Sequence, residues 1–205
     1  MKMDRQAQFR AREVLIFQIA EQLLLENGEA GMTLDALAAE LDLAKGTLYK
    51  HFQSKDELHM LLIIRNEKML LEMIQDTEKT FPEHLAVCML HHLHQPERTA
   101  VFHQLEERLS TTGQGMQLLF SELYRIRRQR LRIIIRMTES HLVDIHSSMT
   151  TRDYLASIWS LTYGAAVILN SSFYQRYLGS RDTLRVAYIE QALAMPKQLE
   201  QVAAS

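Results

Sequence analysis

The chain has 205 residues, enough for one large or two small domains, and 47% of them are apolar, so it can bury a core. A net charge of −2 gives the whole molecule no attraction to nucleic acid, and a single cysteine, Cys88, excludes an intramolecular disulfide and fits a reducing cytosol. Seven glycines and three prolines are few, which favours an all-α fold, and the first twelve residues lack the apolar core of a signal peptide.

The first helix is expected over residues 10–26. The residues at helical spacing that would face inward are Ile16, Ile19, Ala20, Leu23 and Leu24. Gly28 follows, a residue type that commonly ends a helix. This helix would support the next two by packing against them.

Residues 33–58 contain two short helical patterns separated by a tight turn. Thr33 can cap the first helix through its hydroxyl, and residues 44–52 favour the second. Ser54 and Glu57 then fit a capping box at the start of another helix. Two short helices joined by a tight turn describe a helix-turn-helix, whose second helix enters the major groove of DNA.

Charge is segregated along the same region. Residues 43–55 hold three lysines and no acidic residue, whereas residues 13–42 hold seven acidic residues and no basic one. The whole-chain net charge conceals this basic segment, which is an electrostatic footprint of nucleic-acid binding.

The region resembles the TetR/AcrR family of one-component transcriptional regulators. The residues that carry the resemblance are Thr33, Leu37-Ala38, Lys45-Gly-Thr-Leu-Tyr-x-His-Phe52 and Ser54-Lys-Asp-Glu-Leu58. The resemblance implies an all-helical homodimer with an N-terminal DNA-binding domain. It also implies a divergent C-terminal domain that binds a small effector and then releases DNA.

Carried over by position, the resemblance implies a set of DNA contacts. Residues that would approach bases are Lys45, Gly46 and Thr47, with Lys50 on the same helix. Residues that would hold phosphates are Thr33, Tyr49, His51 and Lys55. Two positions depart from the family pattern: Asp42 stands where glycine is usual, and Ala44 stands where serine usually caps the recognition helix.

We expect a three-helix helix-turn-helix domain over residues 1–55 and an effector-binding and dimerisation domain over residues 56–205. The chain would contain about nine helices, those after the first domain lying at about 55–79, 82–95, 97–109, 116–143, 152–178 and 181–202. The helix over 55–79 is too long for one domain, so it would link the two and transmit the signal. Pro196 should bend or interrupt the last helix.

Residues 154–175 carry no charge, and a stretch of this length can span a bilayer. However, Ser160, Thr162 and Asn170 lie within it. A helix that is apolar on nearly all sides can also be buried jointly by its own domain and a partner subunit, and we favour that interpretation over a membrane span.

Residues 124–136 contain six arginines and no acidic residue. Four of them form one outward face at about 100° per residue: Arg125, Arg128, Arg132 and Arg136. Arg127 and Arg130 fall instead among apolar positions, where an unpaired charge is very costly. We favour a protein partner such as Glu106 or Glu107, and the carboxylate or phosphate of a bound effector is the alternative.

Large and adaptable side chains between residues 82 and 178 predict a pocket for an apolar or amphipathic effector. The expected ligand-binding residues are Met89, Phe102, Phe120, Tyr124, Arg127, Arg130, Trp159 and Tyr163. Trp159 and Tyr163 share one side of their helix, and that side suits a pocket wall, a dimer interface or ordinary core. The opposite side carries Ala165 and Ile168, where the resemblance implies a dimer interface formed by the last two helices.

Three other functions were weighed. No GxSxG, HExxH, P-loop or Rossmann pattern is present, so we expect no enzyme and no cofactor. A metal- or redox-responsive regulator would use Cys88 with the histidines around it, namely His91, His92, His94 and perhaps His103, but no second cysteine or carboxylate completes the set nearby. A helical ligand-binding protein without DNA function is opposed by the intact basic segment.

The sequence therefore predicts a cytoplasmic, homodimeric, ligand-responsive regulator that is not bound to a membrane. It would bind a pseudo-palindromic operator in double-stranded DNA, with repression as the expected mode and a small-molecule effector as its inducer.

Overall fold

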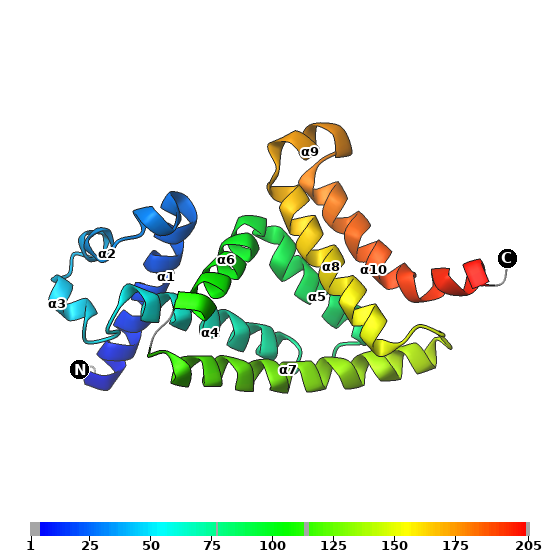
Figure 1. Ribbon diagram of the computed structural model, residues 1–205, viewed down its shortest axis with the longest axis horizontal. Helices are drawn as coiled ribbons and strands as arrows, with labels where there is room; N and C mark the ends of the chain where they lie inside the picture. The colour runs from blue at the N-terminus through cyan, green and yellow to red at the C-terminus, as the bar shows by residue number, and fades with distance from the viewer. Residues whose placement is uncertain (1–4, 77, 113–114, 204–205) are drawn as a thin grey trace. The chain divides into compact units, whose positions relative to one another are not determined.

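The computed structural model describes residues 5–76, 78–112 and 115–203, and within these residues every regular element is a helix (Figure 1). The ten helices are α1 (Arg5–Gly31), α2 (Leu34–Glu40), α3 (Lys45–Leu48), α4 (Lys55–Met73), α5 (Phe81–His94), α6 (Pro96–Thr112), α7 (Gln117–Asp144), α8 (Thr151–Asn170), α9 (Ser172–Leu178) and α10 (Arg181–Ala203). The predicted all-α fold is confirmed, and helix starts at Lys55 and Arg181 agree with the sequence.

The chain divides into two compact units. The first contains the residues up to Asn66 together with His103–Ser121, and the second contains Glu67–Phe102 together with the residues from Glu122 onward. Three helices, α4, α6 and α7, contribute residues to both units.

The first unit is built on the buried face of α1. Ile16, Ala20 and Leu24 are fully buried, as their spacing predicts, and so are Leu37 on α2 and Leu48 on α3. Helix α1 packs against α2, and α2 packs against α3. Each fully buried aliphatic side chain contributes about 1.5–3 kcal/mol, so these residues hold the two short helices in place.

Gly28 has φ +68 and breaks the regular geometry of α1 at the predicted end. A last turn then runs to Gly31, and the Met32 N–H donates to the Gly28 carbonyl at 3.1 Å. A positive φ is a conformation that glycine adopts without steric cost, which is why the sequence signal for this helix end was reliable.

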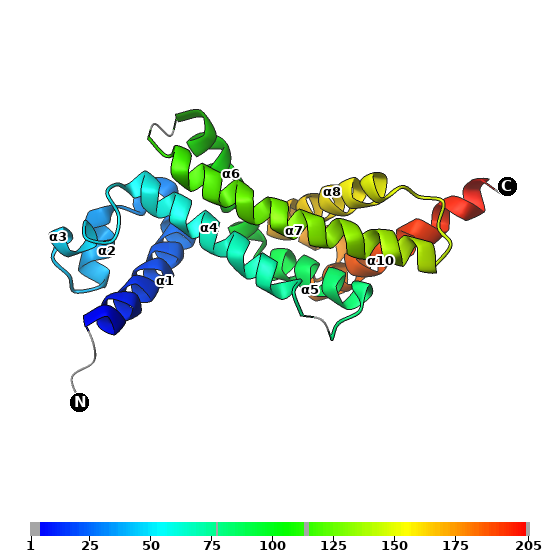
Figure 2. The same ribbon diagram turned by 90° about the horizontal axis from the view of Figure 1, so that it is seen from below.

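Helices α5, α8 and α10 pack side by side in the second unit (Figure 1). Their buried residues form one apolar cluster: Leu85, Met89, Leu93, Leu142, Tyr154, Ile158, Ala165, Ala166, Leu169 and Ala192. Helix α7 runs along the C-terminal part of α4, where the Lys68 amino group pairs with Glu122 at 2.7 Å (Figure 2).

Pro196 lies inside α10 without ending the helix. A proline has no N–H, so the carbonyl four residues earlier, that of Ala192, loses its helical donor. The buried Tyr154 hydroxyl donates to that carbonyl at 2.9 Å, and the Ser147 hydroxyl donates to the Pro196 carbonyl at 2.8 Å. Burial also raises the pKa of Tyr154 to about 12, so the hydroxyl stays protonated and able to donate. These bonds let α10 continue through the proline as one helix, and Figure 1 shows that its C-terminal part turns away from the direction of its first part, so the predicted bend is present and the alternative, an interruption, is not.

The helix expected over residues 152–178 is divided at Ser171. The backbone of Ser171 is extended, its N–H caps α8 by donating to the Ile168 carbonyl at 3.1 Å, and its hydroxyl caps α9. This break gives the tenth helix. Across the described part of the chain, no helix combines the length and apolar character needed to cross a membrane, so the charge-free stretch is not a membrane span.

Candidate DNA interface and ligand pocket

Thr33 fixes the start of α2. Its backbone is extended and its hydroxyl accepts a hydrogen bond from the Ala36 N–H at 3.1 Å, as an N-cap residue should. The Thr33 hydroxyl therefore has a structural partner within α2.

Asp42 and Ala44 shape the turn between α2 and α3. Asp42 has φ +51, the left-handed conformation in which glycine is most at ease. Ala44 is the N-cap of α3 and makes no side-chain hydrogen bond to it. The recognition segment is then one helical turn, Lys45–Leu48, followed by turns to the buried Phe52, which is shorter than the sequence pattern indicated.

Lys45, Gly46, Tyr49 and Lys50 are exposed on and just after α3, and Thr47 is half-buried. The Lys45 amino group lies 2.8 Å from a carboxylate oxygen of Asp35 on α2. The hydrogen bond that Lys45 donates to the Asp35 carboxylate raises the pKa of Lys45, so this lysine stays charged. The exposed face of the helix-turn-helix is thus basic and aromatic, with Asp35 as an internal counter-ion.

His51 lies beneath Phe9 of α1. Its side chain is 1% exposed, and the two rings stack with centroids 4.0 Å apart. Burial lowers the pKa of His51, and neither ring nitrogen has a hydrogen-bond partner in the described part of the chain. The nearest Glu13 carboxylate oxygen is 3.9 Å from Nδ1. The side chain that was expected at a phosphate is therefore covered here.

Lys55 is half-buried, and its amino group donates to the Glu29 carbonyl at the end of α1. Arg108 of α6 joins the same place, with Nε 2.8 Å from the Glu29 carboxylate and an Nη 2.8 Å from the Asp56 carboxylate. His59 is fully buried beside Arg108, and burial together with the charges of Lys55 and Arg108 lowers its pKa to about 4. These contacts fasten α4 to α1 within the first unit.

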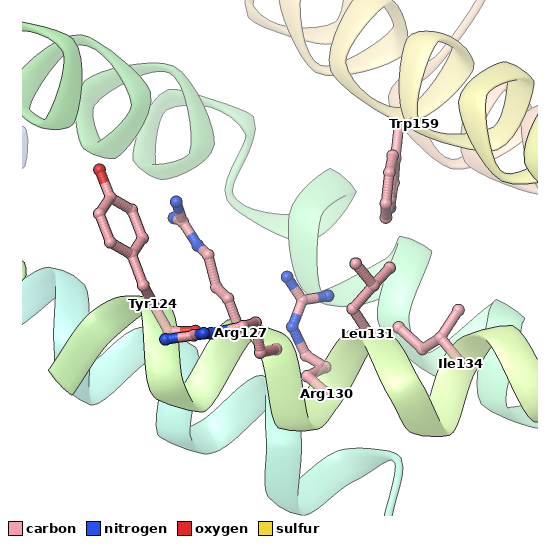
Figure 3. Close-up of a pocket in the computed structure, with 7 residues that line it drawn as sticks. Tyr124, Arg127, Arg130, Leu131, Ile134 and Trp159 are labelled. Carbon is pink, nitrogen blue, oxygen red and sulfur yellow. The ribbon is translucent and has the colours of Figure 1, made fainter. Parts of the chain in front are cut away.

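In the second unit, a partly open cavity of about 450 Å³ lies between α7 and α8 (Figure 3). Seven residues line it: Tyr124, Arg127, Arg128, Arg130, Leu131, Ile134 and Trp159. It brings together four of the eight residues that were expected to bind ligand. The sequence analysis missed Arg128, Leu131 and Ile134, although helical spacing from Arg127 and Arg130 could have indicated them.

The other four expected residues lie elsewhere. Met89 is buried in the apolar cluster of the second unit, and Phe102 is buried under the Arg98 guanidinium, whose central carbon is 4.7 Å from the ring centroid. Tyr163 is exposed on α8 with its ring 5.9 Å from that of His92, and Phe120 belongs to the first unit.

Glu67 of α4 is the carboxylate that pairs with the two inward arginines of α7. Its side chain is 3% exposed; one oxygen accepts from Arg127 Nε at 3.0 Å, and the other accepts from Arg130 Nε. A protein partner was expected, but Glu67 was not among the residues considered, because nothing in the sequence pairs positions sixty residues apart.

On α5, Cys88 is partly buried, and His91 and His92 have protein partners. Burial raises the pKa of the Cys88 thiol, which keeps it protonated. His91 Nε2 lies 3.0 Å from Arg98, and His92 Nδ1 lies 3.2 Å from the Thr99 hydroxyl. Within the described residues, the only grouping of three metal-ligating side chains is Glu29, Asp56 and His59, and there the Arg108 guanidinium forms an ion pair with each of the two carboxylates.

Comparison with known proteins identifies the helix-turn-helix and the fold. Residues 16–59, which cover α2, α3 and parts of the helices on either side, match the profile of bacterial regulatory proteins, tetR family. By contrast, no curated protein matches the sequence.

Among solved structures, a tetR-family regulatory protein from Rhodococcus RHA1 is similar, with a TM-score of 0.66, 19% identity, and coverage of 90% of this chain and 96% of that one. Salmonella enterica GusR aligns with a TM-score of 0.63 and 16% identity over 96% of this chain and 100% of its own. The transcriptional regulator FadR from Bacillus subtilis, solved with stearoyl-CoA, aligns with a TM-score of 0.61 and 17% identity over 86% and 95%.

The protein therefore carries a helix-turn-helix that matches the tetR family of bacterial regulatory proteins, and the fold of the whole chain is similar to that of solved tetR-family regulators.

Proposed function

We propose that the protein is a homodimeric repressor that acts in the cytoplasm and is released from a pseudo-palindromic operator by a small apolar or amphipathic effector. The observation that carries the proposal is the tetR-type helix-turn-helix, which presents an exposed basic and aromatic face. We assign it no catalytic reaction.

In this proposal, Lys45, Gly46 and Thr47 meet base edges, while Tyr49 and Lys50 contact the backbone of the same half-site. The other three residues of the predicted set act by positioning. Thr33 caps α2, Lys55 ties α4 to α1, and His51 packs under Phe9, so each of them sets where the exposed face sits.

The proposed dimer interface is the exposed side of α8 together with α9 and α10. Large apolar side chains are concentrated there: Val167 (62% exposed), Phe173 (61%), Tyr177 (74%), Leu178 (49%) and Val186 (56%). Exposed large apolar side chains gathered on neighbouring helices favour an interaction site. Of the two positions on α8 that were expected at the interface, Ala165 is 2% exposed and packs in the core of its own subunit, so it is not available to a partner.

The proposed effector site is the cavity between α7 and α8. Leu131, Ile134 and Trp159 supply apolar walls, which suit the hydrophobic part of a small ligand. The structural similarity to FadR, a protein solved with stearoyl-CoA, supports an amphipathic class of ligand.

Helix α4 is the proposed route of the signal. It carries Asp56 and His59 in the first unit and Glu67, the partner of two cavity arginines, in the second. A ligand that changes the Glu67 contacts would bias α4, and effector and operator would then weaken each other's binding by the same factor.

Fluorescence anisotropy with labelled operator tests this function. A true effector should lower operator affinity, and operator should lower effector affinity equally. Leu131→Trp should fill the cavity and leave a repressor that binds DNA but is not released, whereas Leu118→Trp, at an 86%-exposed position of the same helix, should respond normally. A compound that binds the cavity without changing operator affinity would show that the cavity does not regulate DNA binding.

A further inference from the structure

The hydrogen-bonding capacity of the Arg130 guanidinium is only partly taken up by other groups of the protein. Its side chain is 19% exposed, and its hydrogen bonding within the described part of the chain is confined to Nε, which donates to Glu67. The two terminal nitrogens of the fork therefore keep their donor capacity. An arginine fork matches a carboxylate or a phosphate oxygen pair better than any other protein group does.

These terminal nitrogens point into the cavity. Figure 3 shows the Arg130 side chain rising from α7 toward the space below Trp159, with Leu131 and Ile134 lying on the same side of the helix. A ligand whose charged end meets Arg130 would thus have its apolar part directed along the indole ring and the two aliphatic side chains.

The charge of Arg130 acts on side chains of α5. The pKa of His92 is lowered to about 4, chiefly by burial and then by the charges of His91, Arg130 and Arg98. Burial raises the pKa of the Cys88 thiol, and Arg130 opposes that rise. The cationic field thus reaches two side chains of α5, and charge in such weakly solvated surroundings acts more strongly than it does in water.

We propose that the cavity is specific for an amphipathic oxyanion, whose carboxylate or phosphate head binds the Arg130 fork and whose hydrocarbon part packs on Trp159, Leu131 and Ile134. This inference rests on the proposed effector site and names the ligand's chemical class. Glu67 is then the competing anion: it orients both arginines and, by its own charge, limits how tightly the ligand's anion is held.

The chain offers a direct reporter, because Trp159 is its only tryptophan and lines the cavity. Its fluorescence can be followed while decanoate, decyl phosphate or decanol is titrated below the concentration at which each probe aggregates. The three probes share one hydrocarbon chain and differ only in the head group. Decanoate or decyl phosphate should bind at least about tenfold more tightly than decanol, as charge-assisted hydrogen bonds require. Whichever of decanoate and decyl phosphate binds more tightly identifies the preferred head group.

Four variants test which residues are responsible for that preference. Arg130→Met should abolish the preference for the anion and leave decanol affinity within about twofold. If Arg130→Met does not fold, Arg130→Lys, which keeps the charge and loses the fork, should still reduce the preference several-fold. Glu67→Gln should tighten binding of the anions and not of decanol. Arg132→Met, an exposed position on the same helix, is the matched control and should behave as wild type.

Equal affinity for decanol and the anions, an anion preference that survives in both Arg130 variants, or no response to any of the three probes would each overturn the proposal. The operator-binding assay separates this result from the proposed function. Release of operator by decanol would leave the effector mechanism in place and refute the anion specificity. Binding of decanoate that depends on Arg130 but leaves operator affinity unchanged would support the anion site and refute induction through it.

Discussion

Asp42 and Ala44 determine how stable the turn before α3 is. Asp42 has φ +51, a conformation that costs an L-residue roughly 1–2 kcal/mol, although a short polar side chain reduces this cost. Ala44 leaves the first N–H groups of α3 without a side-chain acceptor. The recognition segment is therefore weakly held at its start.

Asp42→Gly should stabilise the protein by about 0.5 kcal/mol, because relief of the left-handed strain exceeds the roughly 0.5–1 kcal/mol that glycine costs in chain entropy. Urea unfolding followed by circular dichroism measures the change. Glu40→Gly, at an exposed helical position two residues earlier, should be destabilising by a similar amount. Equal losses in both variants would mean that Asp42 is not strained.

Asp35 restrains the lysine that is proposed to meet DNA. Asp35→Asn should increase DNA affinity several-fold at low salt, because Lys45 loses its internal counter-ion and the face loses a negative charge. The gain should shrink as salt concentration rises. Glu40→Gln, also exposed on α2, serves as the control for general charge. Unchanged or weaker binding by Asp35→Asn would place Lys45 away from the phosphate backbone.

Sequence patterns predicted local backbone geometry and burial better than they predicted which side chains contact each other. The Thr33 cap and the buried positions of α1 follow from neighbours in the chain, and both agree with the structure. The partner of Arg127 and Arg130 is Glu67, sixty residues away, and only the packing of α7 beside α4 brings them together. The stacking of Phe9 on His51 likewise joins two residues that are far apart in the sequence.

Among the helices, α10 shows how a tertiary contact overrides a local signal. Pro196 leaves the Ala192 carbonyl without its helical donor, and Tyr154 of α8 supplies a replacement from a buried hydroxyl. The sequence indicates a bend or an interruption at the proline, and it cannot show that the helix continues, because it contains no information about Tyr154.

Tyr154→Phe should destabilise the protein by about 1–3 kcal/mol, because the Ala192 carbonyl would be buried without a donor. In a Pro196→Ala background the backbone N–H returns, so the same substitution should cost about 1 kcal/mol less. A double-mutant cycle by chemical denaturation measures this coupling. Additive effects would show that the tyrosine does not replace the missing backbone bond.

The existence of the helices was predictable from hydrophobic periodicity and capping residues, whereas some helix boundaries were not. The break at Ser171 was missed because the surrounding residues are helix-compatible and uncharged, and the serine acts only through its extended backbone and its hydroxyl. The division into two units was also out of reach, since each unit combines chain segments that are distant in sequence.

At the scale of the whole molecule, the apolar surface of α8, α9 and α10 is the basis for the proposed dimer. Val167→Glu should give a monomer with little operator affinity, because a monomer presents only one recognition helix and Val167 is 62% exposed within its own chain. Light scattering and urea unfolding should show dissociation without loss of fold. Val143→Glu, at a 72%-exposed position on α7, is the matched control and should remain dimeric. A wild-type protein that is monomeric at micromolar concentration would contradict the proposed assembly.

The most direct test of the account is selection of binding sites by the purified protein from a pool of random duplex DNA. The account predicts an enriched pseudo-palindrome whose half-sites lie about 34–36 Å apart, or a multiple of that distance, along one face of the duplex. It also predicts that a Lys45→Ala variant enriches it poorly and with relaxed sequence preference. No enrichment by the wild-type protein, or the same site selected equally well by the Lys45→Ala variant, would contradict the claim that this helix-turn-helix reads an operator.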